Sequence, residues 1–304
     1  MKHKRLSILS GTLLLTAGGL FAQLLGFFYR VGLSQLIGAE TLGLYQLIMP
    51  VYSLLYAVTV MGLTISVSTL SARAYALGDQ EGVRRVLRRC VTAFLLLIIP
   101  LGIAGIASSE IISTQFLGDI RTRLGVILLV PCILLTGLED LNKYCFYGIG
   151  RIGVPAICEA LEQIIRIAAV FGLLIWIVPQ SPENALGVIV GGMMICELFS
   201  VVFLWVALRK QFRKARPRSG EAEIAWRQIF TIAIPISASS IITTLMSSVN
   251  YILIPQKLIE SGMGISAAMA SFGVLCGMTI PMLMLPTGFV NALGLTVVPD
   301  LAQK

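Results

Sequence analysis

Long apolar stretches separated by short polar loops dominate the pattern of residues along this chain. An apolar helix of about 20 residues can cross the ~30 Å hydrocarbon layer of a membrane. No stretch alternates polar and apolar residues long enough to predict the strands of a membrane barrel. Because each span must satisfy its own backbone groups in lipid, the pattern predicts an all-α polytopic membrane helix bundle. Its eight transmembrane helices are expected at Leu6–Ile37, Leu42–Leu70, Cys90–Ala107, Leu124–Tyr147, Val154–Val178, Ala185–Leu208, Ile229–Leu253 and Ile265–Leu295.

The basic residues predict how these spans are oriented. Lys and Arg gather in the N-terminal tail, in residues 73–89, at Arg151 and in residues 209–227, whereas the loops between hold only Arg121, Arg123 and Lys257. Positively charged loops stay in the cytoplasm. We therefore expect a multi-pass protein of the cytoplasmic (plasma) membrane with both termini in the cytoplasm. Since topology accounts for the net charge of +8, we expect no nucleic-acid partner.

A break in composition predicts the domain organisation. The segment Arg209–Gly220 is strongly basic and contains Pro217. We expect a six-helix first lobe over residues 1–208, a basic cytoplasmic linker over 209–228, and two helices of a second lobe over 229–304. The segment Asp79–Arg89 predicts a short surface helix, since Asp79 can cap it. Its arginines fit either topology alone or attraction to anionic lipid head groups.

The sequence lacks the usual signatures of enzymes and metal sites. His3 is the only histidine, and the six cysteines form no C-x-x-C pair. We therefore expect no catalytic residues, no metal and no cofactor, and we interpret the cysteines as small apolar side chains in the spans. A scaffold without transport, or a transferase that uses Glu139 and Asp140 as an acidic pair, are the alternatives.

Charged side chains within the spans are the candidates for function, because charge in hydrocarbon usually faces a cavity, a partner or a permeant. In the fifth span, Glu159, Glu162 and Arg166 share one helical stripe. Spans four and five are joined by a short loop, so we expect their charges to form one polar layer. That layer predicts either a hydrated cavity for a charged substrate or coupling cation, or a network of salt bridges. The full set is Arg30, Glu139, Asp140, Lys143, Glu159, Glu162, Arg166 and Glu197.

The run Leu24–Ala72 carries a resemblance to a known family. Its G-F-x-Y-R at Gly26–Arg30 and G-A-E-x-L-G-L-Y-Q at Gly38–Gln46, with PTGFVNALGLTVVPDLA at Pro286–Ala302, resemble the stage V sporulation protein B group of polysaccharide-export flippases. This group belongs to the multidrug/oligosaccharidyl-lipid/polysaccharide (MOP) superfamily, which also includes the murein lipid-precursor flippase.

The resemblance implies a V-shaped, two-lobed bundle with a central cleft. It implies a flippase for an undecaprenyl-pyrophosphate-linked saccharide or a peptidoglycan precursor, serving cell-wall, spore-cortex or polysaccharide assembly, with Arg30 meeting the pyrophosphate. Coupling to Na⁺, H⁺ or the membrane potential would involve the acids of the later spans. The alternative is a cation-coupled multidrug exporter of the same superfamily. Since the family has twelve to fourteen helices, we expect this chain to be a fragment or to have an incomplete second lobe.

Overall fold

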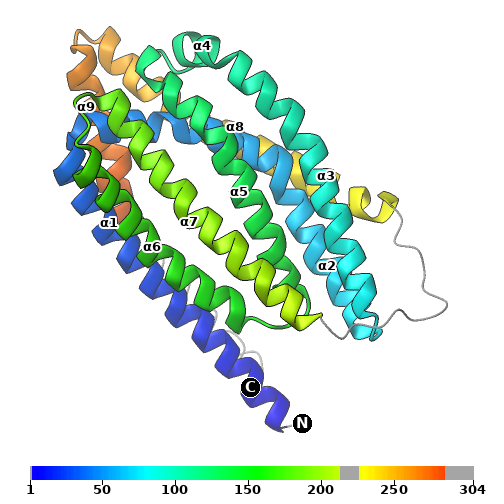
Figure 1. Cartoon of the computed structure of the whole chain (residues 1–304). Coiled ribbons are helices and arrows are strands. Elements are labelled where there is room, and N and C mark those ends of the chain that lie inside the picture. The colour runs from blue at the N-terminus through cyan, green and yellow to red at the C-terminus, as the bar shows by residue number, and fades with distance from the viewer. Residues whose placement is uncertain (1, 213–225, 285–304) are drawn as a thin grey trace, which may run out of the picture.

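The computed structural model describes the backbone of residues 2–212 and 226–284, and side chains from residue 24 onward within these ranges. Residues 213–225 of the expected linker and the motif Pro286–Ala302 lie outside the described residues. Within the described part the chain is a bundle of helices without strands (Figure 1). The predicted fold class, a polytopic helical membrane bundle, is confirmed.

Eight longer helices build the described part, joined by turns and short helical segments. Seven helical units are long and apolar enough to cross a membrane. The shorter segments are η1 (Ala57–Met61), α4 (Ser109–Ile111), η2 (Ile112–Phe116), η3 (Ile120–Thr122) and η4 (Leu275–Thr279). The longer helices are α1 (Lys2–Tyr56), α2 (Gly62–Ala76), α3 (Gln80–Ala107), α5 (Arg123–Gly148), α6 (Gly153–Ile177), α7 (Pro182–Gln211), α8 (Trp226–Glu260) and α9 (Ile265–Val274).

The first helical unit makes two passes because it breaks at Gly38. A straight helix over the 53 residues of Leu24–Ala76 would be about 80 Å long, more than twice the ~30 Å hydrocarbon layer. Gly38 adopts φ 76° and ψ 166°, a conformation that favours glycine. The chain reverses direction there, and α1 returns across the bundle toward α2 (Figure 1). The first two predicted spans are therefore joined by a single-residue break, with no separate loop.

The helix α3 corrects one expectation. Asp79 caps it as predicted, with Oδ1 accepting a hydrogen bond from the Gly82 backbone N–H at 2.6 Å. The helix then continues to Ala107, so the prediction of a separate surface helix over Asp79–Arg89 was wrong. The physical reason is that neither Gly nor Pro follows Arg89 until Pro100, so nothing ends the helix at the membrane surface.

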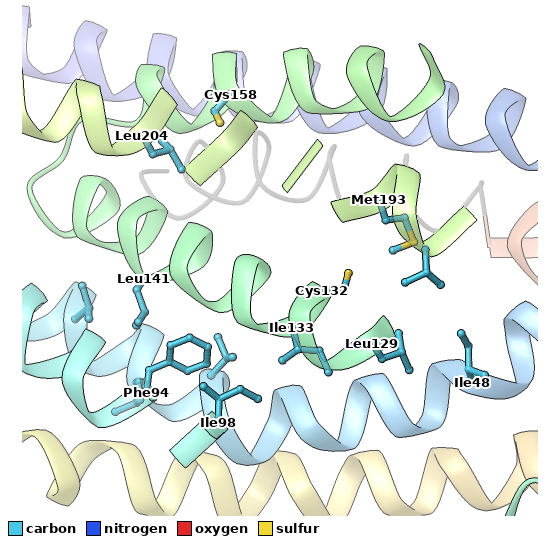
Figure 2. Packing of buried hydrophobic residues seen from close by; sticks show 14 of the residues in the cluster. Ile48, Phe94, Ile98, Leu129, Cys132, Ile133, Leu141, Cys158, Met193 and Leu204 are labelled. Carbon is cyan, nitrogen blue, oxygen red and sulfur yellow. The ribbon is translucent and has the colours of Figure 1, made fainter. Parts of the chain in front are cut away.

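The core of the first lobe lies where α5 packs against α2, α3 and α7. Phe94, Ile98 and Ile133 are fully or almost fully buried there (Figure 2). A Cβ on Gly137 would overlap the ring of Phe94, so this glycine of α5 makes room for the aromatic side chain of α3. The packing fixes α5, and with it the charged residues on its other faces.

The helix α8 packs against α1 and α2, and α9 packs against α1. A Cβ on Gly43 would overlap the backbone carbonyl of Met269, and a Cβ on Gly273 would overlap that of Ala39. Small residues at such crossings allow two helix backbones to approach closely. The start of the expected second lobe therefore lies directly against the first two passes of the chain.

An ion pair ties the turn at Gly38 to the segment between α3 and α5. Arg121 donates hydrogen bonds to Glu40 at 2.6 Å and to Asp119 at 2.6 Å. The side chain of Asp119 is only 5% exposed, so its charge depends on this arginine. Arg121 thus joins two turns at the same end of the bundle.

Candidate functional site

A cavity of about 580 Å³ lies between α1, α6, α8 and the segment around η4. Arg30 of α1 and Arg166 of α6 both line it, and none of the described residues that line it is Asp or Glu. Two guanidinium groups on an acid-free wall favour an anionic occupant. The cavity therefore brings together two charges that the sequence placed in different spans.

Arg30 faces this cavity and has no acidic partner within the described part of the chain. Its side chain is exposed, and none of the ion pairs among the described residues involves it. Its donors are therefore available to a ligand. Gln46 and Gln163 line the same cavity but were not predicted, because they carry no charge. The feature that could have identified them in the sequence is an uncharged polar side chain inside an apolar span.

Arg166 contacts both the cavity and a buried group of acids. Its guanidinium pairs with Glu162 one helical turn away and lies 3.6 Å from Glu197 Oε1. Its Nε also donates to Cys196 Sγ at 3.5 Å. Ligand atoms of Glu162, Cys196 and Glu197 lie within 4.8 Å of one another, but the arginine already occupies the cationic position among them.

Lys143 of α5 lies on the other side of this buried group of acids. Its Nζ lies 2.5 Å from Glu139 Oε1 and 3.3 Å from Glu162 Oε2, so the charges of the fourth and fifth spans meet at one depth. Glu139, Glu162 and Glu197 are all buried, and they face the two cations Lys143 and Arg166. The cluster therefore holds one carboxylate more than it has cations, and Glu197 Oε2 has no hydrogen-bond partner among the described residues.

Asp140 and Glu159 lie outside this buried group. Tyr56 of α1 donates to Asp140 Oδ2 at 2.6 Å, because successive helical residues point about 100° apart and Asp140 cannot share the direction of Glu139. The side chain of Glu159 is 40% exposed, and its Oε1 is 3.9 Å from Lys143 Nζ. Tyr147 donates to the same oxygen at 3.1 Å. Glu159 is thus the solvent-side edge of the network.

A second cavity of about 410 Å³ adjoins the first. Both are lined by Arg30, Tyr45, Gln46 and Tyr251. The second adds a set of aliphatic hydroxyl groups from α1 and α8: Ser53, Thr243, Thr244, Ser247 and Ser248. These hydroxyl groups could have been predicted from the run ISASSIITTLMSS at residues 236–248, because Ser and Thr are frequent there within an apolar span.

Two proteins of Bacillus subtilis are similar to this chain over nearly all of its length. It is 26% identical over 305 residues to stage V sporulation protein B of Bacillus subtilis (strain 168), covering 98% of this chain and 58% of that protein. It is 23% identical over 328 residues to the lipid II flippase MurJ of the same organism, again covering 98% of this chain and 58% of that protein. The chain thus spans less than two thirds of the length of these relatives.

Solved transporter structures share the fold. An inward-facing multidrug resistance MATE family transporter of the MOP superfamily superimposes with a TM-score of 0.66 at 16% identity, covering 93% of this chain and 60% of that one. A MATE in a bent conformation gives a TM-score of 0.58 at 15% identity, with coverage of 98% and 70%. The resemblance found in the sequence is confirmed. A family described as polysaccharide biosynthesis protein matches residues 8–303, and the chain therefore belongs to this family.

Proposed function

We propose that this chain provides the substrate cleft of a flippase in the cytoplasmic membrane. Its substrate is an undecaprenyl-pyrophosphate-linked saccharide or a peptidoglycan precursor, used in cell-wall, spore-cortex or polysaccharide assembly. Residues 1–208 form the first lobe, residues 209–228 the cytoplasmic linker and residues 229–304 the start of the second lobe, with both termini in the cytoplasm. The observation that carries the proposal is the cavity that Arg30 and Arg166 line together without an acid.

Arg30 is the residue that binds phosphate in this proposal. A charged head group crosses hydrocarbon only at great cost, so a flippase must replace the water around it with polar groups. Guanidinium donates two parallel hydrogen bonds to a phosphate. Arg30 supplies these donors without first breaking an ion pair, whereas Arg166 shares its donors with Glu162 and Glu197.

The hydroxyl-lined second cavity supports a saccharide as the rest of the head group. Sugars carry many hydroxyls, and each buried hydroxyl needs a hydrogen-bond partner. The second cavity shares Arg30 with the first. A ligand with its phosphates at Arg30 therefore has a polar compartment next to it, on the face of α8.

The buried cluster is the proposed site of coupling. Its carboxylates Glu139, Glu162 and Glu197 outnumber its cations by one, and buried charge is stable only when it is compensated. Uptake of one proton or one Na⁺ would balance the cluster, and Glu197 Oε2 has no hydrogen-bond partner within the described residues to compete for it. Asp140 and Glu159 flank the cluster and support the helices that carry it.

A cation-coupled multidrug exporter is the weaker alternative. Organic cations need acidic or aromatic groups that face the ligand. Aromatic side chains line the cavity, but none of the described residues that line it is Asp or Glu, and its two charged residues are arginines, which repel a cation. The electrostatics of the cavity therefore favour an anionic lipid-linked substrate.

The test is flipping of a fluorescent undecaprenyl-pyrophosphate-linked saccharide in vesicles that carry the protein. Arg30→Gln should lower the rate by at least about tenfold, since a hydrogen bond to a charged group contributes about 1.5–3 kcal/mol. Arg30→Lys should retain part of the rate, because it keeps the charge but loses the fork. The matched control is Arg151→Gln, an exposed arginine outside the cavity. An unchanged rate in a folded Arg30→Gln protein would disprove the role of Arg30.

A further inference from the structure

A separate groove of about 420 Å³ lies on the first lobe, away from the cavity that holds Arg30. It runs between α3 and α7, and α5 forms its floor because both of these helices pack against it. Its apolar walls include Val91 of α3, Leu138 of α5 and Val201 of α7. The neighbouring α7 side chains Leu198 and Val202 are each 52% exposed, so this face of the bundle is one that contacts lipid.

Three arginines line the same groove: Arg84 and Arg88 of α3 and Arg209 of α7. Arg84 and Arg88 are one helical turn apart and therefore lie on the same face of α3. Arg209 lies over the ring of Trp205, with Cζ 3.6 Å from the ring centre. This cation–π contact holds its guanidinium at the mouth of the groove.

The charge of the groove is strongly one-sided. None of the residues that line it in the described ranges is Asp or Glu. Arg84 pairs with Glu81 at 3.2 Å, but that arginine side chain is 46% exposed, so water screens the pair. The remaining arginines give the mouth of the groove a net positive charge at the end of the bundle that is expected to face the cytoplasm.

The length of the groove matches a lipid chain. From Arg209 at the mouth down to Val201, its α7 wall spans eight residues, which is about 12 Å at 1.5 Å per residue. This is most of the depth of one leaflet, which is about half of the ~30 Å hydrocarbon layer. An apolar slot of this depth below a basic mouth is complementary in shape and polarity to a phospholipid.

We propose that this groove binds an anionic phospholipid of the leaflet at this end of the bundle. Its phosphate lies among Arg84, Arg88 and Arg209, and one acyl chain lies along Leu138 and Val201. Basic pockets between membrane helices bind anionic head groups in this way. The site is independent of the proposed transport cleft, because the two share no lining residue.

The test is native mass spectrometry of the purified protein with phosphatidylglycerol or phosphatidylcholine of the same acyl chains. Arg88→Gln/Arg209→Gln should reduce binding of phosphatidylglycerol by roughly tenfold or more and leave phosphatidylcholine unchanged. The matched control, Arg151→Gln/Arg227→Gln, removes two exposed arginines outside the groove and should bind phosphatidylglycerol as the wild type does.

A second variant tests the apolar part of the site and does not depend on the arginine variant being folded. Val201→Trp fills the slot while all three arginines remain, so binding of phosphatidylglycerol should fall again. Equal phosphatidylglycerol binding by wild type and Val201→Trp would overturn the proposal. So would an equal loss in the control variant, since the attraction would then belong to the whole basic surface.

Discussion

Replacing Lys143 with Met tests whether the buried cluster holds the first lobe together. The Lys143 side chain is only 11% exposed, and its Nζ lies 2.5 Å from Glu139 and 3.3 Å from Glu162. The substitution keeps the apolar stem but leaves two buried carboxylates without their shared cation. Removing one partner from a buried ion pair costs about 3–5 kcal/mol. We expect the free energy of unfolding to fall by that amount.

The six cysteines provide the assay, because all are free and buried. A thiol-reactive fluorescent dye should label the five that lie outside the cavity only as the protein unfolds on heating; Cys276 lines the cavity and is replaced by Ala in all variants. At about 2–4 °C per kcal/mol for a domain of 150–250 residues, Lys143→Met should lower the Tm by roughly 6–20 °C. Adding Glu139→Gln to the variant should recover part of this loss, since it removes the carboxylate whose only described ion pair is with Lys143.

The matched control is Lys257→Met, which also breaks a lysine–glutamate pair. Lys257 lies 2.6 Å from Glu260, but both side chains are more than 60% exposed. Such surface pairs contribute about 0–1 kcal/mol, so this Tm should change little. If Lys143→Met melts within about 2 °C of the wild type, the buried network does not stabilise the lobe and our account of it is wrong.

Three further substitutions probe other contacts, each measured by the same dye. Tyr56→Phe removes the hydroxyl that donates to Asp140 and should cost about 1–3 kcal/mol; an unchanged Tm would mean that water replaces the donor. Gly273→Val places a side chain where two helix backbones meet and should cost about 1–3 kcal/mol through overpacking; a Tm at or above the wild-type value would contradict the close packing. Arg121→Gln leaves the buried Asp119 without its cation and should cost at least about 1–3 kcal/mol, which a wild-type Tm would disprove.

The sequence predicted the fold well because hydrophobic length is a direct consequence of membrane thickness. It predicted two helices around Gly38 but could not show that they form one broken unit. That break depends on the φ value of a single residue, and glycine permits many conformations. The surface helix expected over Asp79–Arg89 failed for a related reason, since the amphipathic start of α3 and its apolar continuation form one helix.

The candidate site was predicted in part. Spacing along one helix indicated that Glu162 pairs with Arg166, and the short loop after α5 indicated that Lys143 reaches the same depth. Spacing could not indicate that Arg166 also lines the cavity with Arg30, since this depends on how α6 packs against α1. The hydroxyl groups of α8 were missed because their role depends on which face of α8 meets α1.

Arg166 lines the cavity on one side and contacts the carboxylates of Glu162 and Glu197 on the other. An anion that enters the cavity competes with these acids for the same donors. Thermodynamic linkage makes such competition reciprocal, so each side weakens the other's hold by an equal factor. An anion bound in the cleft would therefore change the ionic interactions of Glu162 and Glu197 through Arg166, although it does not contact these acids itself.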